Sequence, residues 1–492
     1  MDSTLVPQYA GQSLPQTHHP LAPPPLFVDL DGTLIKTDLL VESYIELCKR
    51  SPLLALRAPL WLLRGKAYLK EQIAATIELD PALLPYDSEV LGYLRSQRDA
   101  GREVHLATAS HRRYAAAVAS YLGLFDRVLA SDGMNNLSGE RKLKAIRAIS
   151  PGGFAYAGNS LADLPIWEAS DAAIFANVPQ AVVEKVSTAK PVEARFSPAE
   201  SGLAPWLLAI RPHQWLKNLL VFLPLLPIIT TANTKMIWMS VLAFVAFCLC
   251  ASSVYLLNDL SDLAADRAHP RKCKRPFASG AIAPLRGLVL AQVLLLLAFA
   301  LTMLLPWRFA AVLGFYWLST SAYTFFLKRL VLIDVVTLAS LYTLRVLGGG
   351  VAINVSPSFW ILAFSVFMFF SLALAKRYAE LYSLNAVNSK TANGRGYHIN
   401  DLQLVQLMGV AAGYISVLVM LLYINSPEII SRYHHLRVLW GVCPLLILWV
   451  SMVWLKASRG EMTDDPIVFA VRDRVSRYVV ALAVGLVLAA LL

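Results

Sequence analysis

Two groups of carboxylates in this sequence have a spacing that suits phosphate chemistry. The first lies in the stretch FVDLDGT, where Asp29 and Asp31 follow a short apolar run. At the end of a strand, residues two apart point to the same side, and Gly32 permits a tight turn after them. Two such carboxylates can share one Mg²⁺ while one attacks phosphorus and the other moves a proton. The alternative is a strand and turn without chemistry.

The second group follows a long apolar run in the C-terminal half. Asp259, Asp262 and Asp266 step by three and four residues, so on a helix they share one face. Like charges this close repel unless a cation lies between them, and isolation at a membrane boundary adds a desolvation cost. Mg²⁺ bridging these oxygens and that of Asn258 to a diphosphate suits such a face. A solvated acidic loop is the alternative.

Basic residues in the same half could bind phosphate groups, with arginine offering bidentate geometry. The sequence does not assign each one to a particular phosphate. The candidates are Lys217, Arg267, Lys272, Arg275, Lys328, Arg345, Lys376 and Arg377. Asp334 lies just inside an apolar run, where a carboxylate needs a partner or a role. It could face one cavity with Arg345, about three turns along the same helix, or form an ion pair with another helix.

The elements that must hold these residues differ between the two halves of the chain. Of 492 residues, 57% are hydrophobic and 16% are charged, which excludes a purely soluble globular protein and a disordered one. Residues 1–200 hold 20 Lys and Arg against 22 Asp and Glu, and residues 201–492 hold 24 against 11. Because the basic excess lies in the apolar half, a membrane is favoured as partner and nucleic acid is disfavoured.

The first half predicts an α/β, Rossmann-like domain over residues 26–186, because short apolar runs alternate with helical patterns. Residues 1–25 are polar and proline-rich, which predicts a disordered tail without a secretory signal. A helical insert covers about residues 39–98. Its basic, apolar part at 53–73 either packs on the core or lies on a membrane surface. Residues 187–204 are predicted to be a linker.

Residues 205–492 predict an all-α membrane bundle, because apolar runs of spanning length follow one another. Nine spans are expected, near 216–231, 237–257, 285–305, 309–327, 331–352, 358–375, 403–424, 436–455 and 475–492. One set of loops holds most of the Lys and Arg residues, whereas the opposite set holds only Lys235, Arg308, Arg432 and Arg437. The basic loops are therefore expected on the cytoplasmic side of an inner membrane, together with the N-terminal domain. The five scattered cysteines indicate neither disulfides nor a zinc site.

The stretch 26–186 resembles the haloacid dehalogenase (HAD) phosphatase superfamily. Thr108 in LATAS matches the family's phosphate-binding Ser or Thr, and Lys142 after NLSGER matches its phosphate-binding Lys. The stretch AGNSLADLP matches the metal-binding loop, with Asp163 as the retained carboxylate and Asn159 where many members carry Asp. The resemblance implies Asp29 as nucleophile, Mg²⁺ as cofactor and the insert as a small cap that selects the substrate. A HAD fold kept as a scaffold without catalysis is the alternative.

Residues 205–492 resemble the UbiA-type intramembrane prenyltransferase superfamily. The resemblance is carried by the motif NDxxDxxxD, which follows a predicted span. Most members carry a second motif, DxxxD, near the sixth span. Here that place reads ALAKRYAEL, so the replacing residues are Lys376, Arg377, Tyr378 and Glu380. Only one carboxylate remains and two cations have entered. This departure argues against a prenyl diphosphate donor held by two aspartate motifs.

With this departure, residues 205–492 resemble one branch of the superfamily, the decaprenyl-phosphate phosphoribosyltransferases. The resemblance is carried by RPHQWLKNLLVFLPLL at 211–226, the motif at 258–276, FFLKRLVLIDV at 325–335, LRVLGGG at 344–350 and AKRYAEL at 375–381. It implies that polyprenyl phosphate attacks C1 of phosphoribosyl diphosphate. The leaving diphosphate would be bound by Mg²⁺ on Asp259, Asp262 and Asp266.

The fusion of the two halves predicts consecutive reactions. The membrane half would make lipid-linked 5-phosphoribose, and the HAD half would remove its 5-phosphate. The product would be a precursor of arabinofuranosyl donors for the cell envelope. The alternatives are prenyl transfer to an aromatic ring and a transporter with a HAD scaffold. The oligomeric state stays open, with a homo-oligomer among the options.

Overall fold

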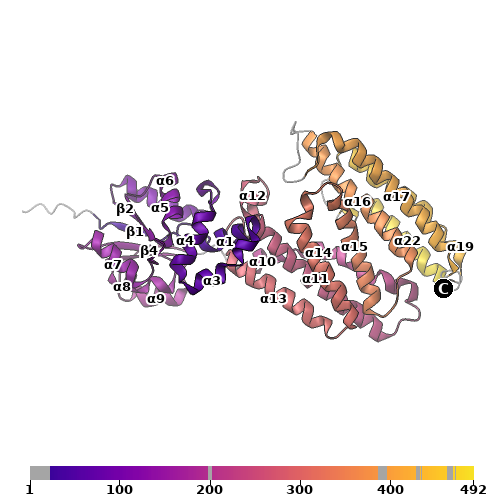
Figure 1. Ribbon diagram of the computed structural model, residues 1–492, viewed down its shortest axis with the longest axis horizontal. Helices are drawn as coiled ribbons and strands as arrows, with labels where there is room; N and C mark the ends of the chain where they lie inside the picture. The colour runs from indigo at the N-terminus through magenta and orange to yellow at the C-terminus, as the bar shows by residue number, and fades with distance from the viewer. Residues whose placement is uncertain are drawn as a thin grey trace, which may run out of the picture. The chain divides into compact units, whose positions relative to one another are not determined.

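The computed structural model describes residues 23–197, 202–385, 396–427, 433, 435–462, 469–470 and 472–491. The chain forms two compact units, Met1–Glu200 and Ser201–Leu492, and each is considered by itself (Figure 1). Most of the tail predicted at 1–25 and residues 198–201 of the predicted linker lie outside the described residues.

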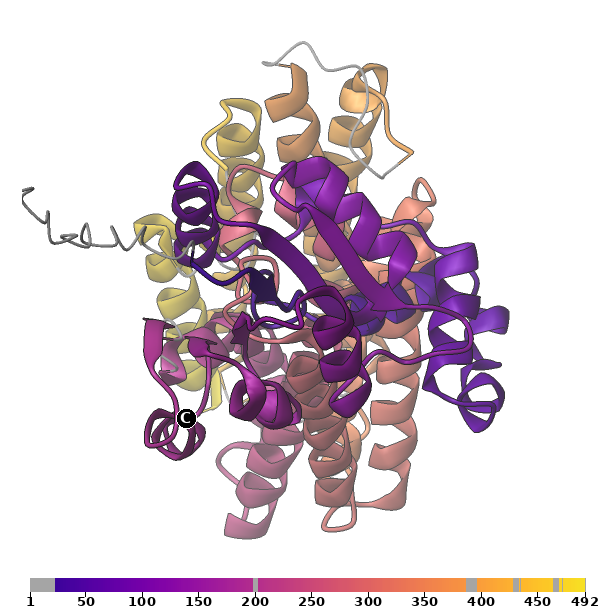
Figure 2. The ribbon, with the colours of Figure 1, turned by 90° about the vertical axis from the view of Figure 1, so that its left-hand side faces the viewer.

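The N-terminal unit is built on one parallel sheet with the strand order β3-β2-β1-β4-β5-β6. Figure 2 shows strands of this sheet running side by side. The α/β prediction is thereby confirmed for this unit. The strands are β1 (Leu26–Val28), β2 (Val104–His111), β3 (Arg127–Ser131), β4 (Ala155–Gly158), β5 (Ala172–Ala176) and β6 (Val192–Phe196).

Both faces of this sheet are covered, because alternate residues of a strand enter different hydrophobic clusters. Leu26 and Val28 pack with α5 (Ser88–Asp99) and α6 (Arg112–Leu122). Phe27, between them, packs on the other face with α7 (Glu140–Ile149), α8 (Leu164–Ala169) and α9 (Gln180–Ser187). Burial on both faces explains why the central strands appear in the sequence as continuous apolar runs.

Strand β6 lies within the segment predicted as a linker. Its sequence, VEARF, contains two charged residues and no apolar run, so the periodicity gives little strand signal. At the end of the strand order it pairs only with β5, and the buried Arg102 forms an ion pair with Glu193 of the new strand. A strand at the edge of a sheet tolerates such polar positions. The sheet therefore extends further along the chain than the sequence indicates.

The predicted helical insert is present. It consists of α1 (Leu39–Arg50), α2 (Pro52–Ala55), α3 (Ala58–Leu63) and α4 (Lys66–Thr76), which surround a small core of Leu47, Ala55, Ile73 and Ile77. Helix α5, which also falls within the predicted cap at 39–98, packs on the sheet through Val90 and Leu94 instead. The separate cap is therefore shorter than expected.

The C-terminal unit is helical, and six helices of its described part are long and apolar enough to cross a membrane. They contain α11 (Thr234–Ser261), α13 (Pro284–Thr302), α15 (Ile333–Ala352), α16 (Phe359–Asn385), α17 (Leu402–Ile424) and α20 (Val442–Ser458). The prediction of nine spans is not confirmed. The first predicted span is the 3₁₀ segment η3 (Pro212–Ile228), where Pro224 and Pro227 lack the N–H groups of a regular helix. Helices α14 (Trp307–Phe325) and α22 (Arg474–Leu491) do not meet the same measure of length and apolarity.

The glycine run at the end of α15 brings this helix close to its neighbours. A Cβ atom added at Gly349 would lie 1.9 Å from the backbone oxygen of Val221 in η3, and one at Gly348 would lie 2.7 Å from the Phe247 ring of α11. Only glycine permits this approach. The motif LRVLGGG thus packs α15 between η3 and α11, and this packing positions Arg345.

Candidate active sites of the two units

In the N-terminal unit, residues predicted for catalysis, phosphate binding and metal binding lie together where the central strands end. Asp29 directly follows β1, Thr108 lies near the end of β2, and Asp163 follows β4. Lys142 of α7 joins them, with its Nζ 3.1 Å from Asp29 Oδ1 and 3.5 Å from Asp163 Oδ1. Because β1 lies between β2 and β4, the parallel order of the strands brings together residues that are far apart in the sequence.

The two aspartates of the first motif have different surroundings. Asp29 Oδ1 accepts a hydrogen bond from the backbone of Leu30 and contacts Lys142, while no hydrogen bond reaches its other oxygen from the described residues. Both oxygens of Asp31 accept hydrogen bonds, Oδ1 from the backbone N–H of Leu39 at 3.0 Å and Oδ2 from the hydroxyl of Ser110 at 2.5 Å. Asp29 therefore has an oxygen available for attack on a substrate.

Burial raises the pKa of both carboxyl groups. For Asp29 burial outweighs the attraction of Lys142 and brings the pKa to about 6. For Asp31 burial and the nearby charge of Asp38 bring the pKa to about 7. Burial therefore makes proton uptake by both carboxyl groups easier than in water.

The metal-binding loop departs from the expected arrangement. The Asp163 carboxylate accepts hydrogen bonds from the hydroxyls of Tyr156 (2.8 Å) and Ser160 (3.0 Å), so both of its oxygens already have partners within the protein. The Asn159 side chain lies so close to Gly32 that a Cβ atom there would be 1.9 Å from its amide nitrogen. Within the described residues, no three His, Cys, Asp or Glu side chains gather as a metal cluster. The remaining oxygen donors Asp29, Asp31 and Asn159 still fit Mg²⁺ by their chemistry.

The sequence analysis missed three residues near this site. Tyr156 and Ser110 bind the catalytic carboxylates, and Lys70 of α4 reaches from the cap to the backbone oxygen of Ala109 (2.5 Å) and to Asn136 Oδ1 (2.7 Å). Thr108 is fully buried, and its hydroxyl accepts a hydrogen bond from the backbone N–H of Ser110 at 3.0 Å. Lys70 is one basic residue among several in the insert, so its sequence alone carried no signal.

In the C-terminal unit, the three aspartates lie at the end of α11 and in the short helix α12 (Leu263–Ala268). Backbone hydrogen bonds from Asp262 to Asn258 (3.0 Å) and from Asp266 to Asp262 (2.8 Å) continue the helical pattern across the junction. We call Asp259, Asp262 and Asp266 the acidic face. Their spacing places them on neighbouring turns, as the sequence predicted.

Each carboxylate of the acidic face is paired with a basic side chain. Arg275 Nη1 lies 3.1 Å from Asp259 Oδ1 and 2.6 Å from Asp266 Oδ2, so one guanidinium bridges two carboxylates. Lys328, in the short turn Leu327–Arg329, lies 3.2 Å from Asp262. Carboxylate oxygens and cations thus alternate along the acidic face, and the two kinds of group suit Mg²⁺ and phosphate by their chemistry. The three carboxylates, held by these cations, do not gather as a metal cluster in the described residues.

Arg211 is a further partner that the sequence analysis did not single out. Its Nη2 lies 2.5 Å from Asp259 Oδ1, and its guanidinium lies 5.6 Å from the centre of the Tyr255 ring. The Arg211 backbone has φ = 54°, in the left-handed region, at the break between α10 (Leu203–Ile210) and η3. The start of the motif RPHQW was the available signal.

Three other predicted phosphate ligands are arranged differently. Arg267 Nε donates to the backbone oxygen of Ala278 at 3.1 Å, which holds the loop after α12. Lys272 is exposed at the surface of that loop, and Lys376 is half-buried on α16. Of these residues, the charge of Lys272 acts on Asp266 of the acidic face.

Arg345 is a buried cation with neutral hydrogen-bond partners. Its guanidinium donates to Asn218 Oδ1 at 2.7 Å, to the Leu341 backbone oxygen at 2.6 Å and to the Tyr316 hydroxyl at 2.8 Å. It also faces the Tyr342 ring, as does the ammonium group of Lys217. Lys217 and Arg345 therefore both lie against the Tyr342 ring. Within the described residues, no carboxylate forms an ion pair with Arg345.

Asp334 does not pair with Arg345. Its Oδ2 lies 2.5 Å from Arg377 Nε of α16, and its Oδ1 accepts a hydrogen bond from the Tyr397 hydroxyl at 2.7 Å. Arg377 also contacts Glu380 at 2.6 Å. The alternative of an ion pair with another helix is thus the correct one for Asp334. Tyr378 belongs to the hydrophobic core, where its ring stacks on Tyr382.

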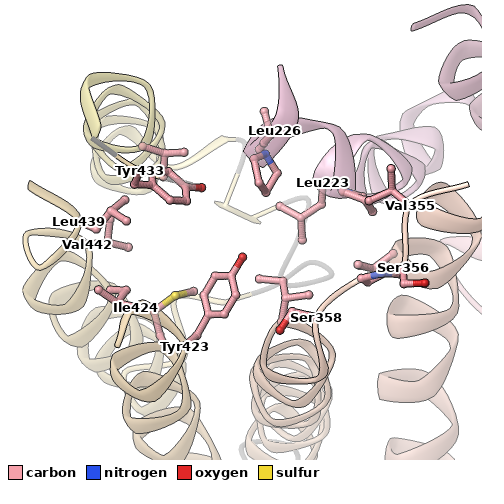
Figure 3. Close-up of a pocket in the computed structure, with 17 residues that line it drawn as sticks. Leu223, Leu226, Val355, Ser356, Ser358, Tyr423, Ile424, Tyr433, Leu439 and Val442 are labelled. Atoms are coloured by element: carbon pink, nitrogen blue, oxygen red, sulfur yellow. The ribbon is translucent and has the colours of Figure 1, made fainter. Parts of the chain in front are cut away.

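An apolar pocket of about 160 Å³ lies at the other end of these helices (Figure 3). Leu223 and Leu226 of η3 line one side, and the Tyr423 ring at the end of α17 points into it from another. Among the described residues that line it, none is charged; they also include Val346, Val355, Ser356, Ser358, Ile424, Tyr433, Leu439 and Val442. The segment η3 begins after Arg211, contains Lys217 and ends beside this pocket. It therefore connects the acidic face, the surroundings of Arg345 and the apolar pocket.

Comparison with known proteins gives matches for both units and for nearly the whole chain. A model of the haloacid dehalogenase-like hydrolases matches residues 26–168, and a model of the UbiA prenyltransferase family matches residues 221–472. The uncharacterized protein y4nM of Sinorhizobium fredii is 39% identical over 462 residues, covering 93% of this chain and 89% of that protein. The nodulation protein NoeC of Azorhizobium caulinodans is 36% identical over 57% of this chain and 91% of that protein.

Decaprenyl-phosphate phosphoribosyltransferase of Mycolicibacterium smegmatis is 34% identical over 197 residues, which is 39% of this chain and 62% of that enzyme. Among solved structures, a UbiA homolog from Archaeoglobus fulgidus bound to GPP and Mg²⁺ is 16% identical, with a TM-score of 0.45 over 58% of this chain and 99% of that one. By the family model and the long relatives, the chain belongs to the UbiA prenyltransferase family as an integral membrane enzyme and carries a haloacid dehalogenase-like hydrolase domain at its N-terminal end.

Proposed function

We propose that the C-terminal unit transfers 5-phosphoribose from phosphoribosyl diphosphate to polyprenyl phosphate, and that the HAD unit then removes the 5-phosphate. Homologues named decaprenyl-phosphate phosphoribosyltransferase, matched at partial coverage, support the first step. The second step is supported by the chemistry of the product, because lipid-linked 5-phosphoribose is a phosphomonoester, which suits a HAD hydrolase domain.

The observation that carries the proposal is the pairing of every carboxylate on the acidic face with a cation. Asp259, Asp262 and Asp266, with Asn258, offer oxygen ligands for Mg²⁺, which would neutralise the leaving diphosphate when bound. Arg211, Arg275 and Lys328 move from these carboxylates to phosphate oxygens when substrate arrives, because phosphate accepts the same charge-assisted hydrogen bonds from them. A phosphate-rich donor therefore finds both kinds of ligand in one place.

The transfer step is a substitution at C1 of the ribose. An oxygen of the polyprenyl phosphate forms the new bond to C1, while the bond from C1 to the diphosphate oxygen breaks and the diphosphate keeps the electron pair. The residues of the acidic face act by binding and orienting the diphosphate. The proposal assigns no proton transfer to them, because a phosphate anion is already a nucleophile.

Arg345 and Lys217 are proposed ligands of a second phosphate. Three of the five N–H groups of Arg345 are used by neutral acceptors, and a buried guanidinium without a carboxylate is costly in a membrane protein. An incoming phosphate would supply the missing negative charge. The apolar pocket beyond them suits part of a long isoprenoid tail, because the described residues of its walls are mostly apolar and uncharged.

The proposed hydrolysis step rests on the surroundings of the two aspartates, since both Asp31 oxygens accept hydrogen bonds while Asp29 keeps an oxygen for attack. Asp29 attacks phosphorus, and Asp31 donates its proton to the ribose 5-oxygen as the phosphorus–oxygen bond breaks. Lys142 and Thr108 bind the phosphate oxygens. Water then cleaves the aspartyl phosphate, with Asp31 as base. Mg²⁺, held by Asp29, Asp31 and Asn159, would neutralise charge on the transferring phosphoryl group.

Both sites are proposed to lie on the cytoplasmic side of an inner membrane. The excess of Lys and Arg in one set of loops assigns these loops and the N-terminal unit to that side. Shared sidedness would let the product of the first site reach the second without crossing the bilayer. A homo-oligomer is compatible with this arrangement, and neither step needs a partner chain.

The test is product analysis with labelled phosphoribosyl diphosphate, polyprenyl phosphate and Mg²⁺, in parallel with labelled prenyl diphosphate and an aromatic acceptor. We expect the ribose label to enter lipid with the wild type and to be lost with Asp262→Ala. Asp401→Ala removes a carboxylate of the same unit outside the acidic face and serves as the matched control. Lipid labelling that persists in Asp262→Ala, or incorporation of the prenyl label alone, would overturn the proposed transfer.

A further inference from the structure

The cap of the HAD unit presents leucines to solvent instead of to its own core. Leu53 is 81% exposed, Leu56 75%, Leu60 63% and Leu63 85%; Leu56 caps the end of α2, and the others lie in α2 and α3. We call these four residues the leucine patch. Large apolar side chains gathered in this way on a hydrolase domain mark an interaction surface, because water exposure of such a group is unfavourable.

The leucines of the patch are not core residues of the cap that failed to pack. The same two helices do bury residues, since Ala55 and Ala58 lie inside the unit and the half-buried Leu54 and Trp61 pack on the small cap core. The helices therefore have a defined inner side that is satisfied. What remains is a second apolar side, and no described residue of the N-terminal unit covers it.

The charge around the patch selects the kind of partner. Between Cys48 and Lys70 the chain has six Lys and Arg residues and no acidic one. The rest of residues 1–200 holds 14 Lys and Arg against 22 Asp and Glu. Arg57, Arg64 and Lys66 are all exposed beside the leucines. Leucines framed by basic residues fit an anionic lipid surface, where the leucines enter the headgroup boundary and the cations meet lipid phosphates.

We propose that the leucine patch docks the cap of the HAD unit on the anionic headgroup surface of the bilayer that holds the C-terminal unit. The chain itself supplies the membrane, because six apolar helices follow the HAD unit in the same polypeptide. Docking is then an intramolecular event at high local lipid concentration, so a small patch suffices. This inference does not depend on which lipid the transferase uses.

Docking would also bear on substrate choice. Helix α4 continues directly from α3 through Gly65, and its Lys70 reaches the backbone beside Thr108 and Ser110. The element that meets the lipid surface is therefore covalently continuous with the element that contacts the catalytic strands. A lipid-linked phosphomonoester is a substrate that such a cap would meet at the membrane.

The test uses the full-length protein in nanodiscs with an environment-sensitive fluorophore. Cys48 and Cys273 are first replaced by Ser to limit background labelling, and one cysteine is introduced by Leu60→Cys. Ala148→Cys, an exposed position of α7, is the matched control; Figure 1 shows α7 at the end of the unit remote from α3. We expect a blue-shifted emission and quenching by lipids that carry a shallow doxyl group for the Leu60 label, and neither for the Ala148 label.

Charge variants test the lipid preference. In nanodiscs that contain phosphatidylglycerol, Arg57→Gln and Arg64→Gln are each expected to weaken docking about fivefold, with little effect in pure phosphatidylcholine. A Leu60 label that stays in water overturns the proposal. A label that is shielded but not quenched by doxyl lipids also overturns it, because protein, either the C-terminal unit or a second copy, would then cover the patch.

Discussion

Arg377 and Asp334 form a buried ion pair between α16 and α15, with the arginine Nε 2.5 Å from the carboxylate Oδ2. Asp334 is 0% exposed and Arg377 1%. The remaining contacts of the guanidinium go to Glu380 and to the Tyr323 hydroxyl. A cation that the sequence analysis treated as a phosphate ligand is thus engaged on three sides by the protein. This geometry favours a structural role at the place where other UbiA-type sequences carry a second aspartate motif.

Removing one partner of this pair is expected to destabilise the C-terminal unit. Asp334→Asn leaves the buried guanidinium with less negative charge, at a cost of about 3 kcal/mol. The thermal unfolding midpoint in detergent should fall clearly. The double variant Asp334→Leu with Arg377→Met removes both charges and should recover most of the midpoint. A stable Asp334→Asn protein that loses only affinity for phosphoribosyl diphosphate would instead make Arg377 a substrate ligand.

Arg211→Gly should separate the backbone role of this position from its side-chain role. The left-handed φ of 54° is unfavourable for arginine and readily adopted by glycine, so relief of the backbone should offset part of the stability lost with the ion pair to Asp259, and the free energy of unfolding should change by only about 1 kcal/mol. It also removes the guanidinium beside Asp259, so transfer should fall by at least about tenfold through a higher KM for phosphoribosyl diphosphate. Arg211→Lys is the comparison that keeps the charge. Full transfer activity in Arg211→Gly would contradict a role in diphosphate binding.

The α/β pattern and the order of the catalytic motifs were readable from the sequence because buried parallel strands leave continuous apolar runs. Asp29, Lys142 and Asp163 were named from their motifs and do meet at one place. Strand β6 was not readable, since an edge strand has no such run. The orientation of the Asp163 carboxylate towards Tyr156 depends on rotamers and tertiary contacts, which no local pattern reveals.

The membrane half shows a different limit. The acidic face was predictable because helical spacing fixes which residues share a side. Its partners were not all predictable, because Arg211 and Lys328 reach it from segments whose positions depend on packing. Apolar length overstated the first span, since it ignores the two prolines that prevent a regular helix in η3.

Asp29→Asn should divide the two proposed reactions. The variant lacks the nucleophile but leaves the C-terminal unit intact, so labelled ribose should still enter lipid at the wild-type rate. The lipid product should then retain its 5-phosphate, whereas the wild type should convert it to the dephosphorylated form. Chromatography of the lipids after mild acid release of the sugar phosphate measures both. Equal accumulation of the phosphorylated lipid by the wild type would show that the HAD unit does not act on this product.

Glu193 of β6 contacts Arg102, which precedes β2, and Tyr93 of α5. Burial acts to raise its pKa, but hydrogen bonds from Arg102 and from the Tyr93 hydroxyl, together with the charge of Arg102, outweigh burial and hold the pKa below its usual value. The folded state thus favours the ionised form. The resulting stability is present above the ordinary glutamate pKa of about 4.3 and is lost as the pH falls through the lower pKa of the folded state.

Glu193→Gln should therefore weaken β6 at neutral pH by up to about 1 kcal/mol, because solvent screens this partly exposed carboxylate, and by much less in acid. Hydrogen exchange of the β6 backbone in the full-length protein measures this locally. Comparing the variant with the wild type at each pH cancels the intrinsic pH dependence of exchange. We expect faster exchange in the variant at pH about 7 and nearly equal exchange near pH about 3. A difference that stays constant across this range would mean that the ion pair with Arg102 does not stabilise the edge of the sheet.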